Sequence, residues 1–249
     1  MDEREHRAML ELDEYHWRYR GRRLILLAEL GKLPLPVDAR VLDAGCGSGR
    51  TLMELKRYGQ ASGIELSPEA AEMARDRGGL DIRIGRLEEL PWDAATFDLI
   101  TCMDVIEHTP DDRVTLGELR RVAKPGGWLV VTVPAYQALW SPHDVANHHY
   151  RRYVRGMLAP AAREAGWEVR RMTSFNSLLL APAAVVRLSS RWRQPVVDGN
   201  YKPELRLGPA WLNTALEQAM RLEASWLAKG RTLAAGLSLL AVLRNPSPP

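Results

Sequence analysis

Histidines, acids and arginines gather in one short stretch of the chain, YQALWSPHDVANHHYRRY at residues 136–153. A histidine titrates near neutral pH, so it can take a proton from a hydroxyl group that is about to react. His149 and His143 are the two candidates for such a general base. A polar network that only fixes the loop, with Asp144 accepting from an arginine, is the structural alternative. Paired arginines can hold a carboxylate or a phosphate, so Arg151 and Arg152 are candidates for binding a substrate. Asp144 and Tyr153 in the same stretch are candidates as well.

A glycine-rich turn with an acid in it, VLDAGCGSGR, occupies residues 41–50. Glycines in such a turn let the backbone approach a bound nucleotide closely. The carboxylate of Asp43 argues against a pyrophosphate, because like charges at short range in a partly buried cleft cost about 1 kcal/mol or more. The dinucleotide fingerprint also requires a glycine where Arg50 stands, which disfavours NAD. S-adenosylmethionine (SAM) has no phosphate but carries an ammonium and a sulfonium, which a carboxylate favours. A turn residue that caps the next helix is the alternative for Asp43.

Glu65 follows Asp43 by 22 residues, at the end of a second apolar segment, GIELS. A carboxylate at this place can accept hydrogen bonds from both ribose hydroxyls of an adenosine cofactor. A plain surface acid is the alternative reading. The two acids together favour SAM as the cofactor and S-adenosylhomocysteine as its product.

Segments of strand type and helix type alternate from about residue 37 to 175. Strands are expected at 39–45, 61–67, 81–85, 97–105, 128–134 and 167–173, and a last one at 236–245. Helices are expected at 49–59, 67–78, 114–127 and 155–166; the second begins with a serine cap and a proline. Repeated strand–helix units predict an α/β fold with a doubly wound, mostly parallel sheet, whose ligand lies at the carboxyl ends of the strands.

Two helical additions flank this core. An arginine-rich amphipathic helix at 11–30 would cap the cofactor cleft, and apolar helices between the last two strands would form a lid. The predicted division is a cap at 1–36, a cofactor-binding core at 37–175, a lid or insertion at 176–232, and a last strand with a tail at 233–249.

Four stretches in this order resemble the class I SAM-dependent methyltransferases: VLDAGCGSGR, GIELSPEAAEMA, GRLEELPWDAATFDLITCMDVIEH and LRRVAKPGGWLVVTVP. The resemblance covers about residues 37–175 and implies a Rossmann-like, seven-stranded sheet with SAM over the glycine turn and adenine beside RLEELP. Arg86 stands where members of the family often carry an acid, so the backbone amide of Leu87 is the expected adenine contact. The cofactor residues implied are Asp43, Gly45, Gly47, Gly49, Glu65, Leu66, Leu87 and Met103.

The segment MDVIEH at 103–108 resembles the matching stretch of the ubiquinone-pathway O-methyltransferases, where two acids and a histidine have been linked to a divalent metal. The pair Glu-His also occurs widely in the superfamily without metal, so we expect no metal here. His108 is then an orienting or structural residue, or a third candidate for the catalytic base. The histidine-rich loop, with HWRYRGRR near the N-terminus, resembles a bacterial subgroup that acts on small molecules or lipids.

Composition limits the partners of the 249-residue chain. A net charge of +3 and a pI of about 9.0 are too weak a basic signal for nucleic acid. Cys46 and Cys102 show no metal-type spacing, which favours a reduced, cytoplasmic setting. No apolar run has the roughly 20 residues of a membrane span, although the apolar helical insertion is compatible with peripheral membrane contact. We expect methyl transfer to a small or lipophilic acceptor, more readily to oxygen than to other atoms. An RNA methyltransferase and a non-catalytic SAM-binding regulator are the alternatives, and the oligomeric state is not indicated.

Overall fold

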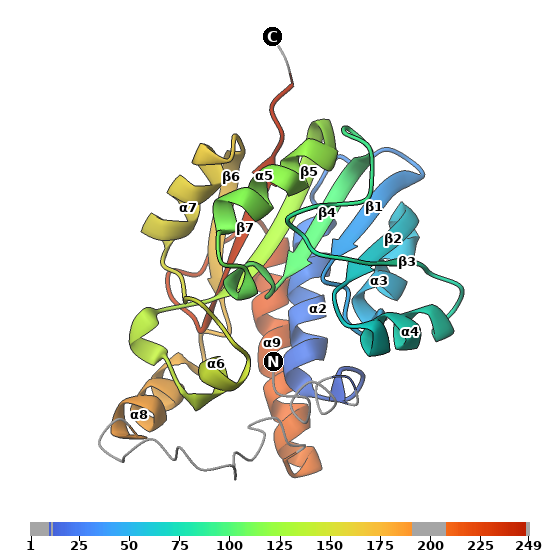
Figure 1. The fold of residues 1–249 in the computed structure, drawn as a ribbon. Coiled ribbons are helices and arrows are strands. Elements are labelled where there is room, and N and C mark those ends of the chain that lie inside the picture. Colours follow the sequence, from blue (N-terminus) through green and yellow to red (C-terminus); the bar gives the residue numbers. More distant parts are fainter. Residues whose placement is uncertain (1–9, 11, 191–207, 248–249) are drawn as a thin grey trace. The chain divides into compact units, whose positions relative to one another are not determined.

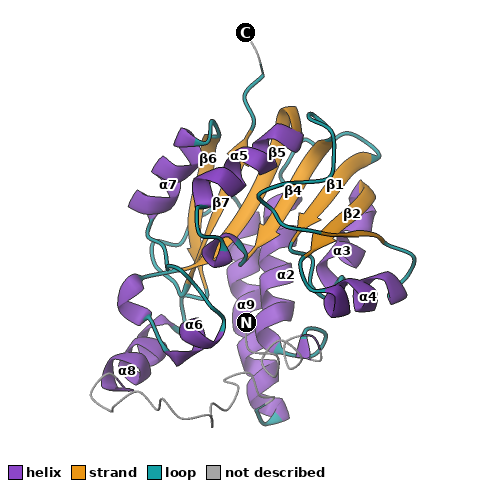
Figure 2. Cartoon of the chain, in the orientation of Figure 1, coloured by secondary structure: helices purple, strands orange, loops and turns teal. Residues whose placement is uncertain are grey.

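The computed structural model describes residues 10, 12–190 and 208–247, with backbone only at 186–190 (Figure 1, Figure 2). Helices and strands follow one another along the chain much as the sequence predicts. None of the helices described is long and apolar enough to cross a membrane. The elements are α2 (Trp17–Leu30), β1 (Ala39–Ala44), α3 (Arg50–Leu55), η1 (Lys56–Tyr58), β2 (Gly59–Glu65), α4 (Pro68–Asp76), β3 (Asp81–Ile84), β4 (Phe97–Met103), η2 (Ile106–His108), α5 (Asp112–Val122), β5 (Ala123–Pro134), η3 (Gln137–Leu139), α6 (Pro142–Ala146), α7 (Arg155–Glu164), β6 (Glu168–Phe175), α8 (Leu180–Ser190), α9 (Ala210–Ala228) and β7 (Ser238–Arg244).

The seven strands form one sheet in the order β3-β2-β1-β4-β5-β7-β6. The pairs β1–β2, β2–β3, β1–β4 and β4–β5 are parallel. The start of β5 meets the end of β7, where the Gly126 N–H donates to the Asn245 carbonyl at 2.8 Å, so β7 runs antiparallel to β5. The predicted seven-stranded, mostly parallel sheet is confirmed. The chain leaves β1 toward one edge and returns to its other side with β4, which places the topological switch point between these two strands.

Contacts divide the chain into two units, a sheet unit and a helical unit, and the predicted division into four segments stays a prediction. The sheet unit consists of Lys32–Val133, Arg155–Met172 and Leu240–Pro249. The helical unit consists of Met1–Gly31, Pro134–Val154 and Thr173–Leu239. The histidine-rich stretch therefore groups with the helices at both ends of the chain and not with the strands that precede it.

Continuous apolar runs in the central strands explain the core of the sheet unit. Val41 and Leu42 of β1 and Leu99 and Ile100 of β4 are fully enclosed, so both faces of the central strands are covered. Helix α4 begins where predicted, because the Ser67 hydroxyl accepts from the Ala70 N–H at 3.3 Å.

The boundary between α5 and β5 differs from the prediction. The sequence suggested a helix over 114–127, but α5 begins at Asp112, capped by Asp111, and ends at Val122. The segment that contains Gly126 belongs to β5, because its backbone pairs with Asn245 far along the chain. Pro125 and Gly126 predict the end of a helix. In the structure, hydrogen bonds between the backbone of Gly126 and Gly127 and that of Asn245 extend β5 through these residues.

The helical unit is built around α2 and α9, which lie side by side (Figure 1). Helix α2 is shorter than the predicted 11–30 helix and begins after His16, whose Nδ1 accepts from the Arg18 N–H at 3.2 Å. A Cβ at Gly21 would lie 2.6 Å from Cγ of Met220, so the small residue permits the close approach of the two helices. Most of the predicted break in the insertion, residues 194–209, lies outside the described residues.

Candidate active site

The glycine turn after β1 has the backbone that its sequence predicts. Gly45, Gly47 and Gly49 have φ of +80°, +51° and +78°, which L-residues rarely adopt. A Cβ at Gly45 would lie 2.5 Å from a methyl group of Val105, and one at Gly49 would lie 2.8 Å from Cβ of Ala74. A Cβ at Gly47 would meet nothing within 4 Å. Two glycines therefore permit packing, and the middle one leaves the turn open to a ligand.

Asp43 lies on β1 inside the sheet unit and is only 2% exposed. Its Oδ1 accepts a hydrogen bond from the Thr101 hydroxyl of β4 at 2.6 Å. The carboxylate thus lies at the switch point between β1 and β4, where a doubly wound fold binds its ligand. Burial, followed by the charge of Asp43, raises the pKa of the Cys46 thiol, so this cysteine stays protonated.

Glu65 closes β2 with both carboxylate oxygens engaged by backbone. Oε2 accepts from the Gly47 N–H and Oε1 accepts from the Ser67 N–H, each at 2.9 Å. These two bonds fix the carboxylate between the glycine turn and the start of α4. Each carboxylate oxygen has a second lone pair that can accept from a ligand hydroxyl. The predicted ribose-binding acid is therefore pre-positioned beside the predicted cofactor turn.

The other predicted cofactor residues of the sheet unit differ in exposure. Leu87 and Met103 are buried, whereas Leu66 is 62% exposed. Asp104 follows Met103 with φ of +57°, and its Oδ1 accepts from the Thr132 hydroxyl at 2.8 Å. Asp104 thus turns the chain at the carboxyl end of β4.

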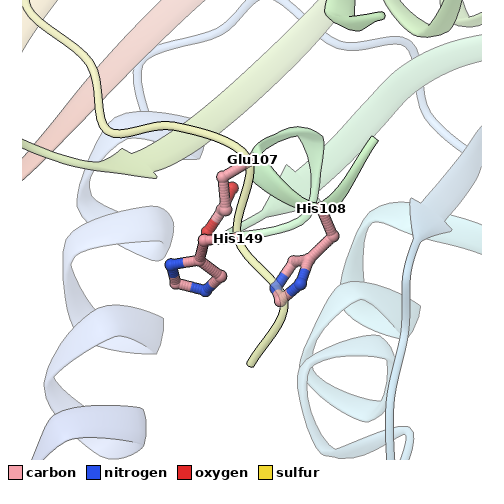
Figure 3. A group of neighbouring side chains, drawn as sticks. All are labelled: Glu107, His108 and His149. Atoms are coloured by element: carbon pink, nitrogen blue, oxygen red, sulfur yellow. The ribbon is translucent and has the colours of Figure 1, made fainter. Parts of the chain in front are cut away.

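The short helix η2 carries Glu107 and His108 (Figure 3). Glu107 is 1% exposed and His108 is intermediate. Figure 3 also draws His149, a residue of the helical unit. The role of His108 as an orienting group or a base stays a prediction, and so does the expectation that no metal binds.

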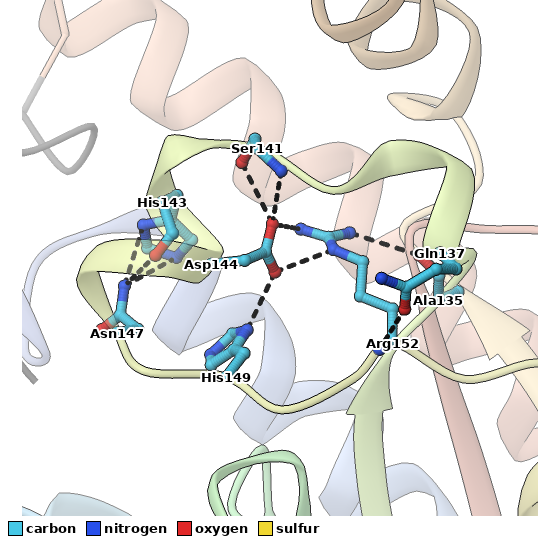
Figure 4. Close-up of polar contacts among 8 residues, drawn as sticks. All are labelled: Ala135, Gln137, Ser141, His143, Asp144, Asn147, His149 and Arg152. Atoms are coloured by element: carbon cyan, nitrogen blue, oxygen red, sulfur yellow. Dashed lines mark hydrogen bonds and ion pairs between the residues drawn. The ribbon is translucent and has the colours of Figure 1, made fainter. Parts of the chain in front are cut away.

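The histidine-rich stretch surrounds one carboxylate, that of Asp144 (Figure 4). Its Oδ1 accepts from His149 Nδ1 and from Arg152 Nε, both at 2.8 Å. Its Oδ2 accepts from Arg152 Nη2 at 2.9 Å, and from the N–H and hydroxyl of Ser141 at 2.8 and 3.1 Å. The side chain of Asp144 is fully buried. Five donors therefore converge on one buried acid.

This environment sets the ionisation of Asp144 and the tautomer of His149. Burial alone opposes the charged form, but the hydrogen bonds from His149 and Arg152 outweigh it and hold the pKa of Asp144 well below its ordinary value. An ionised carboxylate only accepts, so Nδ1 of His149 must be the donor. In a neutral imidazole the lone pair then lies on Nε2. A neutral His149 would then present Nε2 as the atom that accepts a proton.

The arginines predicted to bind substrate are placed differently from one another. Arg152 is 3% exposed, and its guanidinium binds Asp144 and the Ala135 carbonyl at 3.2 Å. Tyr153 is fully enclosed by protein. Arg152 and Tyr153 are thus enclosed by protein, and their role in binding a substrate stays a prediction. Arg151 is only partly buried and lies over the ring of Tyr150.

His143, the rival base, is 5% exposed and contacts Asn147, whose amide nitrogen lies 3.1 Å from its Nδ1. Its ring meets that of His149 edge-on at 6.2 Å. The role of His143 as a base stays a prediction. Sequence reasoning missed Thr101 and Thr132, the hydroxyl partners of Asp43 and Asp104, because each lies far along the chain from its acid. Ser141 was also missed, although a serine three residues before an acid is the local signal of a capping box.

Comparison with known proteins identifies the family. The methyltransferase domain model matches residues 42–131. A ubiquinone biosynthesis O-methyltransferase of Xanthomonas axonopodis pv. citri is 33% identical over 177 residues, which are 63% of this chain and 73% of the relative. The chain is a class I SAM-dependent methyltransferase. The protein of the same name from Xylella fastidiosa is 40% identical over 155 residues, 54% of this methyltransferase and 63% of that relative.

The fold of the methyltransferase extends beyond the matched sequence. A solved complex of the Haloferax volcanii Trm112 methyltransferase activator contains a chain with a TM-score of 0.64 and 22% identity, and the match covers 98% of this chain and 95% of that one. At this identity the likeness concerns the fold. The predicted family membership is confirmed, while the predicted subgroup with the HxRRY loop stays a prediction.

Proposed function

We propose that this methyltransferase transfers the methyl group of SAM to a hydroxyl oxygen of a small, lipophilic acceptor. The pair formed by His149 and Asp144 carries the proposal, since a hydroxyl must lose its proton when its oxygen is methylated. The matched relatives are named O-methyltransferases, which supports oxygen as the atom methylated. A phenolic ring with an isoprenoid tail, as in a quinone precursor, has the required chemistry.

Three features of the sheet unit support SAM as the cofactor. The open side of Gly47 leaves room for a ligand, and Glu65 would accept from the ribose hydroxyls. Asp43 would favour the cationic part of the ligand through its negative charge, and the Leu87 amide would hold the adenine. When bound, SAM supplies an electrophilic methyl group.

His149 is the proton acceptor in this proposal. His149 Nε2 takes the proton of the acceptor hydroxyl as the oxygen is methylated. Asp144 keeps the bond from Nδ1 and stabilises the imidazolium that forms. Arg152 and Ser141 hold the Asp144 carboxylate in position and do not touch the acceptor. The proton then leaves His149 to solvent, which restores the neutral imidazole.

Kinetics of histidine variants test this assignment. With a dihydroxybenzene bearing a short prenyl tail as acceptor, His149→Ala should lower kcat about 10²–10⁴-fold while SAM affinity, measured by calorimetry, stays nearly unchanged. His143→Ala is the matched control in the same loop and should keep kcat within a few-fold. A larger loss in His143→Ala, or in His108→Ala, than in His149→Ala would assign the base to the other histidine. Because no metal is expected, EDTA should leave turnover unchanged.

A further inference from the structure

The outer face of α9 is apolar and exposed. Trp211, Leu222 and Trp226 are 71%, 70% and 43% exposed. At 100° per residue, these positions fall within about 60° of one another on the helix and span about 22 Å of its length. The opposite side carries Met220 and Leu227, which are buried, and that side faces α2. We name Trp211, Leu222 and Trp226 the outer stripe.

Among the described residues, the exposed charges near the outer stripe are basic. The two acids of α9 are buried: Glu217 binds Arg221 and Arg20 at 2.6 and 3.2 Å, and Glu223 accepts from the backbone of 176–178. The exposed charges of α9 and the turn that follows it are basic: Arg221, Lys229 and Arg231. The Arg231 guanidinium lies 4.2 Å from the ring centroid of Trp226, next to the stripe.

The same bias holds for the rest of the helical unit. Among its described residues no Asp or Glu is exposed, whereas Arg20 adds a further exposed cation. The outer stripe presents exposed tryptophans flanked by cations. A protein partner that covered it would need a surface that is both acidic and apolar. An anionic bilayer offers this combination everywhere on its surface, because tryptophan prefers the headgroup level and cations bind acidic lipids.

We propose that the outer stripe of α9 docks the methyltransferase on an anionic phospholipid surface, with the helix parallel to the membrane. The apolar side chains enter the headgroup region, and Lys229 pairs with lipid phosphates. Helix α9 stays packed on α2 through Gly21 and Met220 throughout, so docking needs no unfolding.

Vesicle sedimentation tests the proposal with the full chain and without an acceptor, so its result is independent of the proposed reaction. Vesicles of phosphatidylglycerol and phosphatidylcholine should retain the protein, and vesicles of phosphatidylcholine alone should retain it far less. The double substitution Trp211→Ser, Leu222→Ser should weaken binding at least tenfold. Val37→Ser, at an apolar residue of the sheet unit that is 94% exposed, is the control and should bind as the wild type does.

The charge is tested separately. Lys229→Gln should weaken binding about fivefold at low salt, and Lys56→Gln, an exposed lysine of the sheet unit, should change it little. Circular dichroism checks that each variant is folded. Equal binding to both vesicle types, or unchanged binding of Trp211→Ser, Leu222→Ser, would overturn the proposal. So would light scattering that shows a dimer which this double variant dissociates, since a second copy would then cover the stripe.

Discussion

Replacement of Asp144 by asparagine is the most severe test of the hydrogen bonds that His149, Arg152 and Ser141 donate to this carboxylate. The substitution keeps the shape of the side chain, removes its charge and turns one oxygen into an amide group that donates. At the Oδ1 position this amide would face His149 and Arg152, and at the Oδ2 position it would face Arg152 and Ser141. In either orientation donors oppose donors, and the buried guanidinium of Arg152 loses its counter-charge.

The magnitude follows from burial. A buried ion pair that loses one partner typically costs about 3–5 kcal/mol, and Arg152 and Asp144 have side chains only 3% and 0% exposed. For a chain of this size each kcal/mol lowers Tm by about 2–4 °C, so we expect Asp144→Asn to lower Tm by about 6–20 °C. The loss of Nδ1 orientation in His149 should also lower kcat beyond what the remaining folded fraction explains.

Urea unfolding measures the change in the free energy of unfolding, and calorimetry measures the change in Tm. Glu168→Gln is the matched control, because its partner Arg170 lies at 3.4 Å with both side chains about half exposed, and we expect a cost below about 1 kcal/mol. The double change Asp144→Asn, Arg152→Gln removes both charges and should recover part of the loss. If Asp144→Asn unfolds within 1 kcal/mol of the wild type, the buried pair does not have the role assigned to it.

The cofactor turn and the pH dependence give three further predictions. Asp43→Ala and Glu65→Ala should each weaken SAM binding by about 1–3 kcal/mol in calorimetry, and NAD should not bind. Gly49→Ala should destabilise the fold by about 1–3 kcal/mol more than Gly47→Ala, because only the former meets Ala74; equal unfolding midpoints would contradict this. The pKa of Asp144 is lower in the folded chain than its ordinary value of 3.8, so its stabilisation is present above that pH and lost below it. The stability gap between the wild type and Asp144→Asn should therefore shrink as the pH falls below about 4.

The cofactor side of the molecule follows from local sequence. The turn after β1 has positive φ at Gly45, Gly47 and Gly49. Glycine adopts positive φ most readily, so the spacing of the glycines predicts the backbone of the turn. Ser67 and the proline after it specify the start of α4 in the same way. The seven strands were predicted because apolar runs and turns reflect interactions between near neighbours in the chain.

Features that depend on distant partners could not be predicted in this way. The strand β5 begins before Gly126 because its backbone pairs with Asn245, more than a hundred residues later. Asp43 and Thr101 meet only because β1 and β4 are neighbours. In the histidine-rich loop, the sequence offered Asp144 accepting from an arginine as one alternative, but it did not predict that His149 and Arg152 both donate to this carboxylate.

Transfer of a labelled methyl group tests the central claim most directly. The enzyme is incubated with SAM carrying a carbon-13 methyl group and with the prenylated dihydroxybenzene, and the product is examined by NMR and mass spectrometry. The account predicts one methoxy carbon per molecule of S-adenosylhomocysteine formed, with the yield strongly reduced in His149→Ala. A label on nitrogen or ring carbon, or equal yields from the wild type and His149→Ala, would contradict it.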